Sequence, residues 1–426
     1  MQIDQLSIRN YCCFESFEIS LNPNFNLLVG DNASGKTSIL DAIHIAAGSW
    51  LLGVRGPGKS PSISEGYVRL IPLEYAGGKV TFEKKWPVTI KATGTVMGES
   101  LVWSREKTSD HSTTHYSEAI SIRDVGRRAV DLLPVDRDMV LPLISFYGTE
   151  RLWIEPTEER KERRSKRKKP PSRLDGYDDI HFTIHDEKLF DWIAKQTIAG
   201  LQTGTYSPAF KMVKNAILGC IDDAKDLYYD VDREEVVVIL TTHGTHPFRD
   251  LSDGQRVMLT LVADIAKKAC LLNPNLDEEV LRQTPGVVTI DELDLHLHPK
   301  WQRRVIQDLK RTFPRIQFIA TTHSPQLIGE ALPWETIRLG ADEVQASSPT
   351  QSYGMDSNWI LKYVMDANER DQSVQERIAR ADRLICDLHF AEAREELNSI
   401  RNDIRGNHPE LVRLSARIDR IAGTNK

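Results

Sequence analysis

A short glycine-containing segment near the N-terminus has the residue types needed to hold phosphates. Gly30–Thr37 reads GDNASGKT and matches the pattern GxxxxGK[ST], with an apolar run at 25–29 before it and helical spacing at 37–47 after it. In such a P-loop the backbone N–H groups and the helix N-terminus surround the phosphates. We therefore expect ATP as the ligand. The predicted nucleotide-binding residues of this segment are Gly30, Asn32, Ala33, Ser34, Gly35, Lys36, Thr37 and Ser38.

Individual residues of the P-loop and of a second segment have expected roles with Mg²⁺ and water. Lys36 adds a cation for the β- and γ-phosphates, and the Thr37 hydroxyl is placed for Mg²⁺. The apolar run at 287–290 ends in two carboxylates. Asp291 is predicted to share the Mg²⁺ with Thr37, and Glu292 to polarise the water that attacks the γ-phosphate.

Two further segments, together with these motifs, resemble those of the ABC-type ATPases. The sequence LSDGQ at 251–255 looks like the LSGGQ signature, and its Ser252 hydroxyl and Gly254 N–H would suit a γ-phosphate at a helix N-terminus. TTHS at 321–324 looks like the switch-histidine segment of the same superfamily, in which His323 would read the γ-phosphate. The order of the four motifs along the chain is also the ABC order. This resemblance implies that one P-loop meets Ser252 of another subunit, so at least a homodimer is expected.

Two positions depart from the usual ABC pattern. Ala33 stands where the RecF- and SMC-like branch commonly has Gly, and Asp253 stands where transporters have Gly. Neither change removes a ligand, so we expect them to affect the rate of hydrolysis more than nucleotide binding. His296 and His298, which follow the carboxylates, are expected to pack in the D-loop of that superfamily rather than to bind a metal.

Other segments narrow the resemblance. The opening SIRNYCCF at 7–14 is similar to that of RecF-like proteins, in which an Arg, here Arg9, approaches the nucleotide. Segments 141–153, 291–299 and 353–370 together look like the stand-alone ATPases of bacterial anti-phage systems, PtuA of Septu defence and the retron-associated ATPases. That family implies a homodimer or higher oligomer, a partner HNH nuclease, and regulation of the nuclease by the nucleotide state.

The fold class expected from these patterns is α/β. It is an ABC-type ATPase head, with a P-loop sheet, an antiparallel β lobe that includes the strand at 139–147, a helical insertion and a C-terminal helical extension. Residues 180–228 and about 300–312 are expected to be helical, and Ser373 with Glu376 predicts a capping box. The predicted divisions are 1–150 for the P-loop and β lobe, 151–179 for a basic flexible loop, 180–350 for the insertion and second ATPase lobe, and 351–426 for the extension.

Composition leaves several functions open. The formal net charge of −6 gives no global sign of nucleic-acid binding, but the basic run at 160–173 suits either a solvated loop or contact with nucleic acid or an acidic partner. The five cysteines show no CxxC spacing, and no apolar run spans a bilayer, so a cytoplasmic protein without a membrane role is expected. A RecF-like DNA-repair ATPase that binds DNA directly is the alternative. A nuclease activity of the chain itself lacks candidate metal ligands outside the ATP site.

Overall fold

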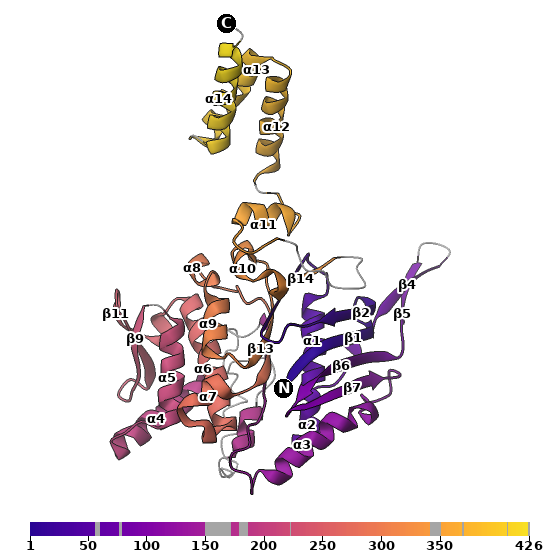
Figure 1. Ribbon diagram of the computed structural model, residues 1–426, viewed down its shortest axis with the longest axis vertical. Helices are drawn as coiled ribbons and strands as arrows, with labels where there is room; N and C mark the ends of the chain where they lie inside the picture. The colour runs from indigo at the N-terminus through magenta and orange to yellow at the C-terminus, as the bar shows by residue number, and fades with distance from the viewer. Residues whose placement is uncertain are drawn as a thin grey trace. The chain divides into compact units, whose positions relative to one another are not determined.

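The structure is a computed structural model in which the chain forms two compact units, Met1–Asp356 and Ser357–Lys426 (Figure 1). It describes residues 1–55, 60–75, 79–149, 172–178, 186–221, 223–340, 351–368, 370–406 and 408–424.

A five-stranded parallel sheet is the centre of the first unit. Its strand order is β14-β3-β13-β12-β8, and every neighbouring pair is parallel. The strands are β3 (Phe25–Gly30), β8 (Leu143–Tyr147), β12 (Gly286–Ile290), β13 (Ile316–Thr321) and β14 (Thr336–Leu339). Nearly all of their residues are buried, as expected for parallel strands covered on both faces. The carboxyl ends of β3, β13 and β12 therefore lie side by side at one edge.

Helix α1 (Lys36–Ala47) lies between this sheet and a second, antiparallel one (Figure 1). The second sheet has the order β2-β1-β6-β7 and consists of β1 (Gln2–Tyr11), β2 (Phe14–Ser20), β6 (Val88–Val96) and β7 (Glu99–Lys107). Because α1 packs on strands of both sheets, it is apolar on most of its circumference. This explains why Lys36–Val54 is the one helical segment, among the described residues, long and apolar enough to cross a membrane, although 78% of that stretch is buried inside the fold.

Helices α5, α6 and α9 lie on the other side of the central sheet (Figure 1). The helices are α5 (Pro208–Cys220), α6 (Asp253–Leu272) and α9 (Val305–Thr312), and α4 (Asp186–Thr203) precedes them in the chain. The small antiparallel sheet of this region consists of β9 (Ala224–Asp230), β10 (Glu235–Leu240) and β11 (Gly244–Pro247). The remaining elements of the first unit include α2 (Leu51–Val54), β4 (Leu70–Tyr75), β5 (Lys79–Lys84), α3 (Ile120–Leu132), η7 (Arg173–Tyr177), α7 (Val280–Gln283), α8 (Pro299–Gln302) and α10 (Pro325–Glu330).

The predicted α/β class is confirmed, with its P-loop sheet, antiparallel lobe and helical C-terminal extension, but three local predictions were wrong. The strand in 139–147 belongs to the central parallel sheet rather than to the antiparallel lobe, because β8 is buried on both faces and pairs with β12. Residues 224–230 form strand β9 rather than helix. The helix expected at 300–312 is broken into α8 and α9 at Arg303–Arg304.

The basic run at 160–173 falls mostly outside the described residues, so the expected loop and its contact with nucleic acid remain predictions. Its last member, Arg173, is described and differs from the expectation of a solvated cation. The Arg173 guanidinium donates hydrogen bonds to the carbonyl oxygens of Leu272, at 2.7 Å, and of Met139, at 2.5 Å. Arg173 is therefore tied to the end of α6 and belongs to the folded core of the first unit.

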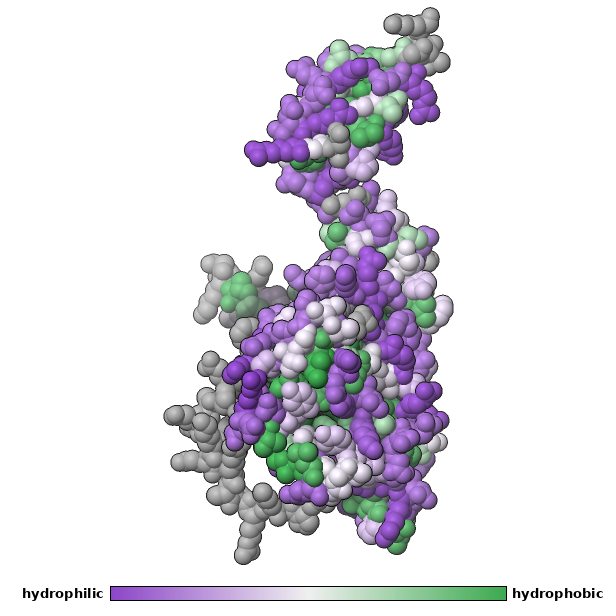
Figure 2. Space-filling model, turned by 90° about the vertical axis from the view of Figure 1, so that its left-hand side faces the viewer, coloured by the Kyte–Doolittle hydropathy of each residue, from purple (hydrophilic) through white to green (hydrophobic). Residues whose placement is uncertain are grey.

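The second unit is built from α11 (Ser357–Tyr363) and three longer helices, α12 (Gln372–Cys386), α13 (Phe390–Ile404) and α14 (Pro409–Thr424). Apolar residues at helical spacing form its core, which comprises Ile378, Ala381, Ile385, Ala393, Leu397, Ile400, Leu411, Leu414 and Ile418. The surface of this unit is largely hydrophilic in Figure 2. Helix α12 is capped by Asp371, which accepts from the backbone of Ser373 and Val374, so the predicted Ser373 cap was wrong by two residues.

Candidate nucleotide-binding site

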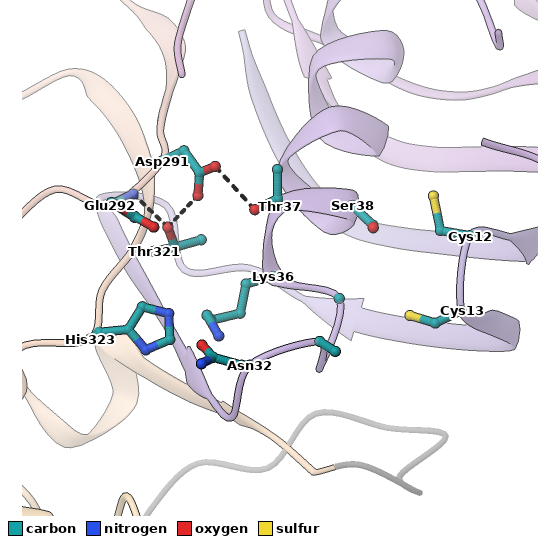
Figure 3. A pocket seen from close by; sticks show the side chains of 12 residues that line it. Cys12, Cys13, Asn32, Lys36, Thr37, Ser38, Asp291, Glu292, Thr321 and His323 are labelled. Atoms are coloured by element: carbon teal, nitrogen blue, oxygen red, sulfur yellow. Dashed lines mark hydrogen bonds between the residues drawn. The ribbon is translucent and has the colours of Figure 1, made fainter. Parts of the chain in front are cut away.

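The P-loop and the segments that follow β12 and β13 converge at one edge of the central sheet (Figure 3). Together with the β1–β2 turn they enclose a cavity of about 390 Å³. Ligand sites of parallel α/β sheets form at this carboxyl-end edge. The cavity is lined by Cys12, Cys13, Asn32, Ala33, Gly35, Lys36, Thr37, Ser38, Asp291, Glu292, Thr321 and His323.

Two glycines of the P-loop are required by close approach of neighbouring atoms. A Cβ on Gly30 would lie 2.6 Å from the carbonyl oxygen of Leu339 on β14. Gly35 has φ of +86°, and a Cβ there would lie 2.4 Å from the Phe14 ring and 2.8 Å from the Cys13 sulfur. Ala33 has φ of +66°, the left-handed region that favours glycine, so its side chain is held at a cost in backbone strain. The departure from Gly at this position therefore places an alanine in a conformation that favours glycine.

Lys36 is buried at the base of the loop, and its ammonium group donates to two loop carbonyls. The Lys36 Nζ lies 2.9 Å from the Gly30 oxygen and 2.7 Å from the Asp31 oxygen. Burial lowers the pKa of Lys36, whereas the nearby carboxylates of Asp291 and Asp31 oppose that shift. The loop thus holds a cation at the wall of the cavity.

The two residues predicted as Mg²⁺ ligands lie together. The Thr37 hydroxyl donates to one Asp291 carboxylate oxygen at 3.0 Å, and the Thr321 hydroxyl donates to the other at 2.6 Å (Figure 3). Asp291 is buried, and its backbone N–H donates to the Tyr147 oxygen of β8 at 2.8 Å. A hydroxyl and a carboxylate oxygen that converge in this way fit Mg²⁺, which takes few protein oxygens and keeps places for phosphate and water.

The predicted catalytic residues line the same cavity. Glu292 has φ of +48°, and its backbone N–H donates to the Thr321 hydroxyl at 2.7 Å. His323 follows β13 and is half-buried, with its ring beside Lys36 and Glu292 in Figure 3. The His323 backbone N–H lies 3.4 Å from the Asp294 carboxylate, which also accepts from Thr322 at 2.6 Å. The loop after β12 and the loop after β13 are therefore tied to each other directly beside the cavity.

The signature-like segment lies at the start of α6 and does not line this cavity. Ser252 caps the helix by accepting from the Gln255 N–H, while the Gln255 side chain accepts from the Ser252 N–H. Gly254 is pressed against the loop after β12, since a Cβ there would lie 2.7 Å from the His296 oxygen. The exposed Ser252 is thus presented at a helix N-terminus, away from the P-loop of its own chain.

The structure brings most of the predicted site residues together. Asn32, Ala33, Gly35, Lys36, Thr37, Ser38, Asp291, Glu292 and His323 all line the cavity. Gly30 and Ser34 support the loop from behind: Ser34 is buried, and its hydroxyl has no hydrogen-bond partner in the described structure. Arg9 is exposed on β1 and does not line the cavity, so the structure does not place it at the site.

Sequence reasoning missed four residues at or beside the cavity. Cys12 and Cys13 line it from the β1–β2 turn, and Thr321 bonds both Asp291 and the Glu292 backbone. Asp41, one helical turn after Thr37, accepts from the Tyr67 hydroxyl. The position of Asp41, one helical turn after Thr37, and that of the two cysteines in the turn between β1 and β2 could have suggested that these residues lie near the P-loop. The pairing of Thr321 with Asp291, in contrast, can be predicted only when the strand order of the sheet is known.

Asp41 is a carboxyl group held in a partly buried place. Burial, and then the charge of Asp291, raise the pKa of Asp41 to about 7, although the hydrogen bond from Tyr67 opposes the shift. Tyr67 in turn stacks on Tyr11, with ring centroids 5.2 Å apart. This cluster joins α1 to the β1–β2 hairpin immediately behind the P-loop helix.

Comparisons with known proteins agree with this geometry. One family model, described as an AAA domain, matches residues 5–200, and another, described as an AAA domain, putative AbiEii toxin, Type IV TA system, matches residues 213–329. The first match contains the P-loop. The second contains Ser252, Asp291, Glu292 and His323.

Several curated relatives share different lengths of the chain. The retron Ec83 probable ATPase of Escherichia coli is 25% identical over 450 residues, which is 87% of this chain and 77% of that protein. Septu protein PtuA of Bacillus thuringiensis is 33% identical over 134 residues, which is 30% of this chain and 34% of that protein. Among solved structures, the SMC head domain from Thermotoga maritima matches with a TM-score of 0.43 and 14% identity, over 82% of this chain and 100% of that one.

The P-loop geometry predicts the effect of Gly35→Ala. The new methyl group would collide with Phe14 and Cys13, so the loop must move and lose N–H contacts to phosphate. We expect ATP affinity to fall roughly tenfold or more, since each charge-assisted hydrogen bond is worth about 1.5–3 kcal/mol. Isothermal titration with ATP measures this. Gly98→Ala is the matched control, because Gly98 has φ of +84° but no neighbour within 4 Å, and unchanged affinity is expected there. Equal affinity of the two variants would contradict this account of the loop.

The raised pKa of Asp41 predicts a pH dependence of stability. The folded chain binds the Asp41 proton more tightly than the unfolded chain does. The contribution of this proton to the free energy of unfolding is therefore fully present below about pH 4 and is lost as the pH rises through about 7. Asp41→Asn should flatten the decline of unfolding free energy between pH 4 and 8 by an amount on the order of a few kcal/mol. Urea unfolding at several pH values measures the difference from wild type, and Asp4→Asn, at an exposed carboxylate of β1, gives the background. Parallel pH profiles for wild type and Asp41→Asn would show that Asp41 titrates normally.

Proposed function

We propose that this chain, a member of the AAA-type ATPases with relatives among the retron ATPases and Septu PtuA, binds Mg²⁺ and ATP in the cavity at the edge of its central sheet and hydrolyses the nucleotide slowly, as a switch. The observation that carries the proposal is the convergence of Lys36, Thr37, Asp291 and Glu292 on one cavity from two different strands.

Each lining residue has a role in this reaction. The P-loop N–H groups and Lys36 would bind the phosphates, and Thr37 with Asp291 would hold Mg²⁺. When bound, the metal neutralises charge on the phosphates. Glu292 would orient and polarise the attacking water, and Thr321 fixes the Glu292 backbone through its 2.7 Å hydrogen bond. His323, which lines the same cavity, would contact the terminal phosphate.

The site of one chain supplies only one face of the nucleotide. Ser252 and Gly254, which would contact the γ-phosphate by resemblance to ABC-type ATPases, are not among the residues that line the cavity of their own chain. Ser252 is exposed at the N-terminus of α6, where a helix end favours negative charge. We infer that a second copy supplies this segment, so that ATP is bound between the two subunits of a homodimer or a higher oligomer.

The proposed biological role is regulation of a nuclease partner in a bacterial anti-phage defence complex. Similarity to a retron ATPase and to a Septu protein supports a defence association. An HNH nuclease is the partner that the resemblance to PtuA indicates, and a cytoplasmic location belongs to the same proposal.

The ATP-dependent assembly is tested by Glu292→Gln. Glutamine keeps the shape of the side chain but cannot polarise water, so this variant should retain ATP and hold two copies together. We expect its mass, measured by light scattering, to at least double when ATP and Mg²⁺ are added. Adding Lys36→Ala to the same chain should abolish the change. A mass that stays that of one chain while ATP is bound would refute the shared site.

The partner is tested by co-expression with the product of the neighbouring open reading frame. We expect a stable complex, with a nuclease activity that differs between the nucleotide-free protein and the ATP-bound Glu292→Gln variant. If no complex forms and the isolated chain instead binds duplex DNA with steep salt dependence, the RecF-like alternative is favoured.

A further inference from the structure

A buried polar network joins the middle of α6 to strand β8. Asp264 and Lys268, one turn apart on α6, form an ion pair with an Nζ-to-oxygen distance of 2.7 Å, and their side chains are only 14% and 7% exposed. The Tyr147 hydroxyl donates to Asp264 at 2.8 Å, and Lys268 donates to the Ser145 hydroxyl at 2.8 Å. The Lys268 ammonium also lies 5.3 Å from the centre of the Tyr147 ring. Burial raises the pKa of Tyr147 well above its ordinary value, so its hydroxyl remains a donor.

The same Tyr147 is attached to the metal-site strand. Its backbone oxygen accepts from the Asp291 N–H at 2.8 Å, and it pairs with Ile290 of β12. One residue therefore contacts α6 through its side chain and the segment carrying Asp291 through its backbone.

The N-terminal end of α6 is attached to the same segment a second time. Gly254 packs against the His296 oxygen, four residues after Glu292. The distance from Ser252 to Asp264 is 12 residues, or about 18 Å of helix. Helix α6 thus contacts the loop after β12 near its signature end, and at its middle it is hydrogen-bonded to Tyr147 and Ser145 of β8.

The energetics of buried ions indicate that this network does more than stabilise the fold. Removing two charges from water costs free energy that their attraction often only just offsets, and well-packed apolar replacements are frequently neutral. The face of α6 that packs on β8 could instead bury apolar residues, at a lower cost in desolvation free energy. What a directional network adds is one defined orientation of the helix against the strand.

We propose that Asp264, Lys268 and Tyr147 are positioning residues that hold the signature end of α6 in a fixed orientation relative to Asp291 and Glu292. The nucleotide bound at the P-loop of one subunit then controls the position of that subunit's signature segment, which contacts the nucleotide of the second subunit. This inference rests on the proposed function, in which Ser252 acts on the ATP of another copy. The network would then couple the two nucleotide sites of a dimer without contacting either nucleotide.

The test removes the network without leaving one buried charge. The double variant Asp264→Leu/Lys268→Met replaces both ions with apolar side chains, and Tyr147→Phe/Ser145→Ala removes only the two side-chain hydrogen bonds between α6 and β8. Both are made in the full-length Glu292→Gln chain for association and in the otherwise wild-type chain for turnover. Binding of a fluorescent ATP analogue to the dilute protein should change by less than about twofold. ATP-driven association should weaken roughly tenfold, within the usual range of coupling between sites, with a lower kcat at unchanged KM and a Hill coefficient near one.

The matched control is Arg304→Met/Asp308→Leu, which removes another i,i+4 ion pair with a buried carboxylate, between the residue preceding α9 and the first turn of that helix. It should leave association and the Hill coefficient unchanged. If the variants at Asp264, Lys268 and Tyr147 associate and cooperate like the parent, the positioning role is refuted. If the parent Glu292→Gln chain itself does not associate with ATP, the proposed function fails first. Should the double variant not fold, Tyr147→Phe/Ser145→Ala decides, since it removes both hydrogen bonds to β8 and keeps the ion pair.

Discussion

The hydrogen bond between Thr37 and Asp291 joins the two parts of the chain on which the site depends. These residues are 254 positions apart in sequence, yet their oxygens lie 3.0 Å apart. This proximity exists only because β3 and β12 flank β13 in a parallel sheet, so that their carboxyl ends share one edge. Thr321 then completes the arrangement from the intervening strand, by donating to Asp291 at 2.6 Å. The order of three strands is therefore the constraint that turns separate motifs into one cavity.

Some of the residues with strained backbone lie at or beside the same cavity. Ala33, Glu292 and His296 are non-glycine residues with φ of +66°, +48° and +62°. Such conformations persist only where the surrounding structure fixes them, and they recur at functional sites. At Glu292 the Thr321 hydroxyl holds the backbone N–H, and at His296 the carbonyl is covered by Gly254 of α6. The loop after β12 is thus held in one conformation between strand β12 and helix α6, which is the physical basis for treating the two as one unit.

Local motifs were predictable from sequence, whereas non-local pairings were not. The P-loop was predictable because the backbone conformation at Gly35 and the side chain of Lys36, which hydrogen-bonds to Gly30 and Asp31, both belong to one short segment. Strand β8 was assigned to the wrong sheet because a short apolar run does not reveal its neighbours. Arg9 was expected at the nucleotide by resemblance, but it lies exposed on β1, and Cys12 and Cys13 of the following turn line the cavity instead. The Asp371 cap was missed because Ser373 offered the same pattern two residues later, and only the hydrogen bonds distinguish them.

The central claim is that a complete ATP site needs two copies of the chain, and subunit mixing tests it most directly. Lys36→Ala removes the phosphate-binding cation, and Ser252→Arg blocks the signature, so each variant alone should be inactive. In a mixed dimer, one site combines the intact P-loop of the Ser252→Arg chain with the intact signature of the Lys36→Ala chain. We predict that mixing the two inactive proteins restores ATP hydrolysis, up to roughly a quarter of the wild-type rate if subunits exchange at random and each intact site works alone. Hydrolysis that stays absent in mixtures proven to contain mixed dimers, or that survives in Ser252→Arg alone, would contradict the shared site.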